Sequence, residues 1–258
     1  MTDFASDFVV VIPARYASTR LPGKPLLKIG DKSLIRHVCD QALMSKASQV
    51  IVATDDQRIV EHLVESEITV VMTSPDCQSG TDRIAQASRL LNLPGEIVVV
   101  NLQGDEPFMP PGVINQIARA LIDNPEIRMS TGCEQLTDKN RWGSPDVVKV
   151  TRDKNHLALY FSRSLIPYCV DGQNQKIFKH LGIYAYTVDY VQEFASLGPC
   201  SLEKSEKLEQ LRALYNGDRI IVTEITQPTG IGVDTPDDLD AARKIYRQSS
   251  IREPVSKS

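Results

Sequence analysis

Positive charge is concentrated in one short stretch, PARYASTRLPGKP at residues 13–25, which also contains prolines and a glycine. Its three cations are Arg15, Arg20 and Lys24. Such a loop can offer guanidinium forks, an ammonium group and backbone N–H groups together to a polyphosphate. It matches neither GxxxxGK[ST] nor GxGxxG, so the pattern favours a nucleotide-phosphate site that is neither a Walker loop nor a dehydrogenase turn. A solvated basic loop stiffened by prolines is the alternative.

Two aspartates far apart in the sequence are suited to holding a metal ion. Asp105 follows an apolar run at residues 97–101, and Asp234 follows another at residues 220–225. Mg²⁺ prefers oxygen ligands, commonly one or two carboxylates with substrate phosphates and water. Taken alone, the string GDEP around Asp105 is equally typical of a turn with a solubilising acid, and Glu106 is treated as structural.

The string QSGTDR at residues 78–83 places an amide, a hydroxyl and a small residue before a predicted helix. The side chains of Gln78 and Ser79, beside the small Gly80, are suited to reading the exocyclic edge of a nucleobase. Simple capping of the helix by Ser79 explains the same residues. Composition leaves both interpretations open.

Short runs rich in β-branched residues surround these motifs and predict strands buried on both faces. They lie at residues 8–12, 50–53, 69–72 and 97–101. Segments whose apolar residues have helical spacing separate these strands. One contains Ile35, Val38 and Ala42, and the others lie at residues 58–64, 81–91 and 113–122. The alternation predicts an α/β fold with a mostly parallel sheet, whose strand ends would gather the motifs at one edge.

The second half of the chain departs from this alternation. Residues 149–187 are expected to form strands and loops that lid or extend the sheet. Leu208, Leu211 and Tyr215 suggest one face of a helix, followed by a strand at 220–225, a helix at 237–247 and a flexible polar tail at 248–258. No linker demands separable domains, so residues 1–258 are treated as one domain with an inserted region at 149–187.

Composition argues against several classes of protein. The 258 residues carry a net charge of −4, which gives no electrostatic drive toward nucleic acid or anionic membranes. The five cysteines are far apart and lack ligand-like spacing, which favours a reduced, cytoplasmic protein. No apolar run approaches the roughly 20 residues that span a bilayer, and the first residues lack the features of a signal peptide. We expect no nucleic-acid or membrane partner.

As a whole string, IPARYASTRLPGKPL at residues 12–26 closely resembles the signature of the 3-deoxy-manno-octulosonate (Kdo) cytidylyltransferases, or CMP-Kdo synthetases. The resemblance spans nearly the entire chain, through IVATDD at 51–56, QSGTDR at 78–83, NLQGDEP at 101–107, ALYFSRSLIP at 158–167, KHLGIYAY at 179–186, LEQLRAL at 208–214 and GVDTPDDL at 232–239. It implies a three-layer fold of the nucleotide-diphospho-sugar transferase (GT-A-like) type and a homodimer built from residues 149–187.

The resemblance also distributes the candidate residues over two substrates and a metal. It implies that Arg15, Arg20 and Lys24 are catalytic cations, with Lys24 on the α-phosphate, and that Asp105 and Asp234 hold Mg²⁺. The expected nucleotide contacts are Ala14, Gln78, Ser79, Gly80 and Gln103, and the expected sugar contacts are Arg163, His180, Glu209 and Gln210. On residue type alone, the sugar group could equally be a surface ion pair, a structural histidine and a solvated helical pair.

The implied reaction is displacement at the α-phosphorus of CTP by the anomeric hydroxyl of an ulosonic acid, which gives a CMP-sugar for lipopolysaccharide synthesis and releases pyrophosphate. Departures from the commonest family pattern at Cys77, Asp146 and Lys204 leave the sugar open. Acidity at Asp146 would suit an 8-amino sugar, 8-amino-3,8-dideoxy-manno-octulosonate. The rivals are an acylneuraminate cytidylyltransferase, whose loop pattern differs from RLPGKP, and a catalytically silent nucleotide-binding module, which would have little reason to retain Lys24, Asp105 and Asp234 together.

Overall fold

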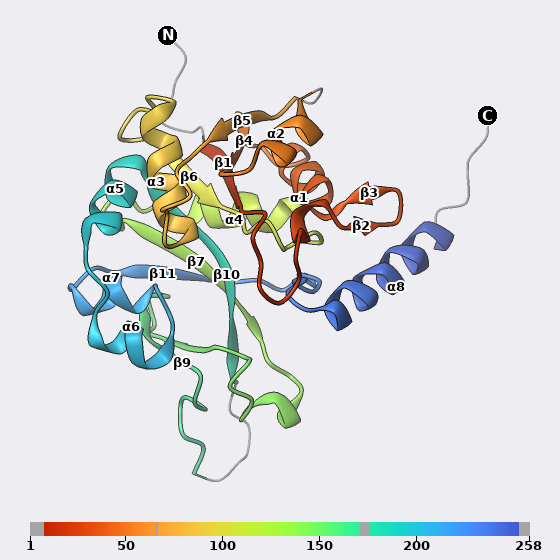
Figure 1. Cartoon of the computed structure of the whole chain (residues 1–258). Coiled ribbons are helices and arrows are strands. Elements are labelled where there is room, and N and C mark those ends of the chain that lie inside the picture. The colour runs from red at the N-terminus through yellow and green to blue at the C-terminus, as the bar shows by residue number, and fades with distance from the viewer. Residues whose placement is uncertain (1–7, 65–66, 171–175, 253–258) are drawn as a thin grey trace.

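A computed structural model of the chain describes residues 8–64, 67–170 and 176–252, which form a mixed sheet with helices on both faces (Figure 1). The main path of the sheet has the order β11-β7-β10-β6-β1-β4-β5. These strands are β1 Phe8–Ala14, β4 Gln49–Thr54, β5 Thr69–Met72, β6 Val98–Asn101, β7 Met129–Gln135, β10 Phe178–Thr187 and β11 Ile220–Glu224. Strand β1 pairs in parallel with both β4 and β6, so the predicted strand ends do meet at one edge.

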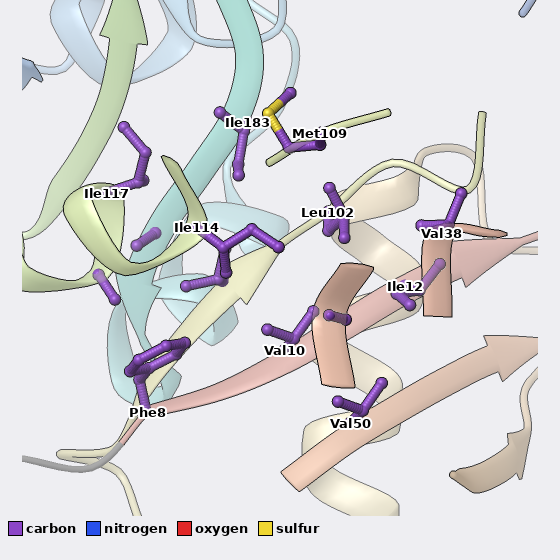
Figure 2. Close-up of a cluster of buried hydrophobic side chains, with 14 of the residues drawn as sticks. Phe8, Val10, Ile12, Val38, Val50, Leu102, Met109, Ile114, Ile117 and Ile183 are labelled. Atoms are coloured by element: carbon purple, nitrogen blue, oxygen red, sulfur yellow. The ribbon is translucent and has the colours of Figure 1, made fainter. Parts of the chain in front are cut away.

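The centre of the sheet is buried on both faces because alternate residues of β1 enter different cores. Val10 and Ile12 pack with α1 Leu34–Leu43, α2 Gln57–Leu63 and α4 Pro111–Ile122 on one face, as Figure 2 shows for part of this cluster. Val9 and Val11 pack on the other face, with α3 Gly80–Leu90 and α5 Val188–Ser196. This arrangement confirms the predicted three-layer α/β fold.

The first-half elements lie within a few residues of their predicted bounds. Their ends are set by local chemistry, since Ser33 caps α1 and Asp56 caps α2 through side-chain hydrogen bonds to backbone N–H groups. Helix α3 begins with a full capping box, in which Ser79 and Asp82 each accept a hydrogen bond from the other's backbone. A small hairpin, β2 Lys28–Ile29 and β3 Lys32–Ser33, precedes α1.

The predicted lid at residues 149–187 divides into two parts with different roles. Its last ten residues are β10, which lies between β6 and β7 in antiparallel pairing and is therefore a central strand and no lid. The short strands β8 Lys149–Arg152 and β9 Ala158–Ser162 form an antiparallel extension, joined to the sheet where β8 pairs with the start of β10. Figure 1 shows this extension projecting from the main body. The segment that connects β9 with β10 includes residues 171–175, which lie outside the described part.

Two further boundaries differ from expectation. Helices α6 Ser201–Glu206 and α7 Leu211–Tyr215 are short, and Leu208, Glu209 and Gln210 lie in the turn between them, with Tyr215 exposed. The expected single helical face through Leu208, Leu211 and Tyr215 is therefore wrong, because α7 begins only at Leu211 and Leu208 lies in the turn before it. Helix α8 runs over Pro236–Arg252, so the helix extends into the predicted tail, whose remainder at 253–258 lies outside the described residues. Within the described residues, no helix has the length and apolar character needed to cross a membrane.

Candidate functional site

The loop after β1 is held in a defined conformation by its own turns and by a distant helix. Gly23 has φ of +68°, a left-handed conformation that favours glycine, and it begins the short 3₁₀ turn Lys24–Leu26. Leu21 is buried against Val233 and Leu239, which lie immediately before and within α8. The phosphate-loop candidate and the segment that carries Asp234 therefore form one packed unit.

A cavity of about 370 Å³ opens at the carboxyl ends of β1 and β6. That volume is within the range of small-molecule sites, and the position is the one that ligands occupy in open α/β sheets. The cavity is lined by Pro13, Ala14, Arg15, Ser18, Thr19, Arg20, Lys24, Pro25, Cys77, Gln78, Ser79, Gly80, Arg83, Gln103, Gly104, Asp105 and Asp234. It therefore brings together every predicted catalytic, nucleotide-binding and metal-binding residue.

Lys24 lies at the centre of the charged part of this cavity. Its Nζ is 2.7 Å from Asp105 Oδ2 and 3.0 Å from Asp234 Oδ1. Burial alone would lower the pKa of Lys24, but the two carboxylates together outweigh that effect and raise it. Arg20 adds a second contact to Asp234, at 3.2 Å, while its side chain stays 64% exposed. Arg15 is exposed and faces the same cavity.

The two aspartates converge because their backbones are joined. The Val233 N–H donates to the Asp105 carbonyl oxygen at 2.9 Å, which aligns the two segments across more than a hundred residues. Asp238 accepts hydrogen bonds from the backbone N–H groups of Asp234 and Thr235 and from the Thr235 hydroxyl. These contacts fix the start of α8 and hold Asp234 at the cavity rim.

The carboxylates of Asp105 and Asp234 fit the donor set of a hard divalent cation. Both direct an oxygen at one cationic atom, Lys24 Nζ, so a single ion could be reached from both sides. The described residues contain no cluster of three or more His, Cys, Asp or Glu side chains with metal-binding geometry. Two carboxylates are sufficient for Mg²⁺ when phosphate oxygens and water complete its shell.

Glu106 is placed apart from this pair. It packs against Gly232, where an added Cβ would come within 2.9 Å of the carboxylate. Burial, and then the nearby Asp105, raises the pKa of Glu106 to about 7, while Lys179 opposes that rise. Its treatment as a structural residue agrees with this position, since it does not line the cavity.

The opposite wall of the cavity is built at the start of α3 and the end of β6. Gly80 lies close to Pro13, and Gly104 leaves no room for a side chain because an added Cβ would be 2.9 Å from the Pro13 carbonyl. Gln103 donates from Nε2 to Asn101 Oδ1 at 2.7 Å, while its Oε1 is on the Gly80 side. The wall thus presents amide and hydroxyl groups close to the backbone of β1, as a base site requires.

Arg83 is a cavity residue that sequence reasoning missed. It is almost fully buried, and it donates to Asp55 Oδ2 at 2.7 Å and to the Thr73 hydroxyl. The motifs IVATDD and QSGTDR contain both charged partners, but only the parallel packing of β4 and β5 beneath α3 brings them together. The spacing within either motif gives no signal of this ion pair. Cys77, Ser18 and Thr19 also line the cavity without having been predicted.

Arg163 and His180, two of the predicted sugar contacts, have protein partners and do not line the cavity. The Arg163 guanidinium donates to the carbonyl oxygens of Glu206 and Pro145, at 2.7 and 2.9 Å. His180 is buried between the rings of Phe161 and Tyr184. Burial, together with Lys179, lowers its pKa to about 3, so the imidazole is neutral.

Glu209 and Gln210, the other two predicted sugar contacts, do not line the cavity either, but Glu209 contacts the helix that forms the base wall. The Thr81 hydroxyl of α3 donates to Glu209 Oε2 at 2.6 Å, and Arg212 lies 3.7 Å from Oε1. Glu209 Oε1 and Gln210 Nε2 are buried and have no hydrogen-bond partner in the protein. Unsatisfied buried polar atoms are uncommon and need an explanation. The sugar role of this pair stays a prediction.

Comparison with known proteins finds one family over most of the chain. A family model described as cytidylyltransferase matches residues 9–220. The 3-deoxy-manno-octulosonate cytidylyltransferase of Pseudomonas fluorescens SBW25 is 47% identical to this chain, in an alignment that covers 92% of this chain and 97% of the relative. The protein of the same name from Marinobacter nauticus is 45% identical, and its alignment covers 95% of this chain and 99% of the relative.

The fold comparison agrees with the sequence comparison. A solved structure of CMP:2-keto-3-deoxy-manno-octonic acid synthetase complexed with CTP superposes with a TM-score of 0.89 at 38% identity. The alignment covers 94% of this chain and 99% of the solved one.

Proposed function

This chain belongs to the 3-deoxy-manno-octulosonate cytidylyltransferase family, and on that premise we propose that it joins CTP and Kdo to give CMP-Kdo and pyrophosphate. One observation carries the proposal from the side of the structure. Four cations, Arg83 among them, and two carboxylates line the same cavity as the base-side residues Gln78, Ser79 and Gly80. A cavity so composed has the groups that a nucleoside triphosphate requires.

The reaction needs the anomeric hydroxyl of the sugar to attack the α-phosphorus of CTP while pyrophosphate leaves from the opposite side. Lys24, Arg15 and Arg20, which line the cavity, would neutralise negative charge as it moves toward the leaving group and help to align the triphosphate. Lys24 would first have to leave Asp105 and Asp234, since its ammonium is engaged by both. Asp105 and Asp234 would hold Mg²⁺, which supplies charge neutralisation at the phosphates when it is bound.

The sugar identity rests on the relatives and not on the cavity. The 8-amino sugar is not favoured, because the relatives carry the name of unmodified Kdo. Asp146 and Lys204, the positions that suggested it, are exposed and do not line the cavity. A catalytically silent module is also disfavoured, since Lys24, Asp105 and Asp234 are retained and meet in one place.

The parallel assay of three sugars tests the proposal directly. Pyrophosphate release is measured with CTP and Mg²⁺ in the presence of Kdo, its 8-amino analogue or a neuraminate. We expect release with Kdo, with a kcat/KM above that for either other sugar. If release is fastest with another sugar, that sugar is the substrate in place of Kdo. The absence of release with all three sugars would overturn the cytidylyltransferase assignment.

We also propose that the protein is a homodimer, that it is located in the cytoplasm and that it acts in lipopolysaccharide synthesis. Leu159, Tyr168 and Val170, which belong to residues 149–187, are large apolar side chains with 62%, 82% and 82% exposure. Exposed apolar groups gathered in one projecting region are typical of a contact surface. Light scattering should give twice the chain mass for the wild type and a lower mass for Leu159→Glu, and a monomeric wild type would contradict the dimer.

A further inference from the structure

Helix α6 ends beside the extension formed by β8 and β9, and its last residue, Glu206, makes the contact (Figure 1). Glu206 Oε1 accepts a hydrogen bond from the Ser162 hydroxyl at 2.6 Å, and Oε2 accepts from the Arg163 backbone N–H at 2.9 Å. The Glu206 carbonyl oxygen accepts from Arg163 Nε at 2.7 Å. The carboxylate and the backbone of one residue therefore hold the end of β9 at three points.

The buried Lys149 holds the same part of the extension from within. Its ammonium donates to the carbonyl oxygens of Ser144, Val147 and Arg163. The Arg163 backbone thus has its N–H bonded to a carboxylate and its C=O bonded to an ammonium. Hydrogen bonds to charged groups are shorter and stronger than those between neutral groups, so the extension offers Glu206 a firmly held partner.

The turn at residues 207–210, which follows Glu206, depends on tertiary contacts for its placement. Helix α6 has only six residues, and Lys207 ends it with φ of +55°, a left-handed conformation that is uncommon for a residue with a side chain. The turn itself contains no helix or strand before α7 begins at Leu211. Its local structure alone therefore does not fix its position.

The turn is attached on two sides. Leu208 is buried in the core that contains Ile84 of α3, and the Thr81 hydroxyl of the same helix donates to Glu209 Oε2 at 2.6 Å. On the other side, Glu206 ties the start of the turn to β9. The turn consequently joins the helix that forms the base wall to the extension.

The turn also carries two polar groups that the protein leaves unpaired. Within the part of the chain that the structure describes, Glu209 Oε1 and Gln210 Nε2 are buried and have no hydrogen-bond partner. A sugar hydroxyl both donates and accepts, so it could pair with either group. Any shift of the turn would move both groups away from a bound sugar.

We propose that Glu206 is a positioning residue for the sugar, because it fixes the turn that carries Glu209 and Gln210 against the end of β9. The role is separate from nucleotide binding, since neither Glu206 nor its partner Ser162 lines the nucleotide cavity. The inference rests on the proposed cytidylyltransferase function and on the sugar contacts predicted for the turn.

The test measures the use of the sugar and of the nucleotide separately in the full-length enzyme. Glu206→Ala removes both carboxylate bonds to β9 and changes no residue of the cavity lining. The kcat/KM for Kdo should fall about ten- to a hundredfold, because displacement of binding groups by about 1 Å has effects of this size. The KM for CTP and the calorimetric affinity for CTP should stay within about twofold of the wild type.

Two milder variants and a control accompany this change. In Glu206→Gln the amide oxygen can accept from the Arg163 N–H and the amide nitrogen can donate to the Ser162 oxygen, so kcat/KM for Kdo should stay within about fivefold of the wild type. Ser162→Ala removes one of the two carboxylate bonds and should lower it about threefold. Glu193→Ala removes a carboxylate of α5 that is paired with Arg128 and should change neither parameter.

Hydrogen exchange of the free enzyme shows whether the turn itself is released. In Glu206→Ala the amides of residues 207–213 should exchange faster than in the wild type, whereas those of α3 should not. Loss of Kdo use without faster exchange in this segment would contradict the proposal, since the effect would then not arise from the turn.

The kinetic outcomes decide the role. Unchanged kcat/KM for Kdo in Glu206→Ala overturns the proposal, and so does an equal rise in the KM values for Kdo and CTP, which would indicate a general disturbance of the fold. A loss in Glu206→Gln as large as in Glu206→Ala also overturns it. If Glu206→Ala does not fold, Ser162→Ala decides, and an unchanged kcat/KM for Kdo in that variant is the contrary result.

A wild type that releases no pyrophosphate with any sugar would overturn the proposed function by itself. Calorimetric titration of Kdo into the CTP-bound enzyme, with Mg²⁺ withheld so that no turnover occurs, then decides the role of Glu206. Weaker Kdo binding in Glu206→Ala than in the wild type would support the role. Equal binding in both, or no Kdo binding to this inactive wild type, would overturn it.

Discussion

The residues predicted to bind the nucleotide (the nucleotide side) and those predicted to bind the sugar (the sugar side) hold their polar groups differently. On the nucleotide side, Arg15 and Arg20 are exposed at the cavity, and Lys24 is held only by two carboxylates of that same cavity. On the sugar side, the guanidinium of Arg163 is bonded to backbone carbonyls and His180 is enclosed by aromatic rings. The first region keeps its charges available to a ligand, whereas the second uses them within the protein.

Because of this difference, binding of a ligand would require different exchanges of interactions in the two regions. A triphosphate can replace carboxylate partners of Lys24 with phosphate oxygens, so one charge-assisted contact is exchanged for another. A sugar that recruited Arg163 would have to compensate for two lost hydrogen bonds to carbonyl groups, each worth about 1.5–3 kcal/mol to a charged donor. Glu209 and Gln210, which have unsatisfied atoms already, demand less.

The largest expected effect comes from removing a carboxylate on the nucleotide side. Asp105→Asn keeps the shape of the side chain but removes its charge, and we expect the Mg²⁺-dependent rate of pyrophosphate release to be abolished. The rate is measured across a Mg²⁺ titration, with Asp123→Asn, an exposed acid at the end of α4, as the control. Undiminished activity in Asp105→Asn would remove this residue from the metal pair.

Lys24→Ala tests the cation at the centre of the cavity. We expect turnover to fall about 10²–10³-fold, since loss of one preorganised charge stabiliser has effects of this size. Lys28→Ala removes an exposed lysine from the neighbouring hairpin and should leave turnover unchanged. Thermal denaturation of both variants shows that folding is retained, and a near-normal rate in Lys24→Ala would contradict the role.

A smaller effect, on the pH dependence of stability, tests whether His180 on the sugar side is enclosed by the protein. Burial, with Lys179, lowers the folded-state pKa of His180 to about 3, against a value near 6.5 in the unfolded chain. Between these values the unfolded chain binds a proton that the folded protein does not, so His180 reduces stability as the pH falls below 6.5.

The measurement compares wild type with His180→Gln by urea unfolding at pH 7 and pH 5. Relative to the wild type, the variant should lose about 2 kcal/mol less free energy of unfolding between the two pH values. The exposed His156, changed to Gln in the same way, is the matched control. An identical pH dependence in wild type and His180→Gln would mean that the imidazole is accessible to solvent, and the contrast between the two regions would be lost.

Local patterns were sufficient for the first half of the molecule. The β-branched runs and helical spacing place β1, β4, β5 and β6 within a few residues, and β1, β4 and β6 are apolar because both their faces are buried. The expected burial of β5 on both faces is wrong, because β5 lies at the edge of the sheet and its Met72 is exposed. Motifs that follow such strands must meet at one edge of a parallel sheet, and Arg15, Gln78 and Asp105 do so. The same reasoning was wrong at Leu208 and Tyr215, because α7 begins only after Leu208 and Tyr215 is exposed.

By itself, then, the sequence determined the α/β architecture, the membership of the nucleotide motifs in one site and, by resemblance, the family. Only the tertiary structure decided that Lys24 lies between Asp105 and Asp234, that Arg83 pairs with Asp55 and that Arg163 is bonded to carbonyl groups. The physical reason is the range of the interactions. Strand and helix patterns arise from neighbours along the chain, whereas the partner of a charged side chain is chosen among groups that only folding brings within about 3 Å.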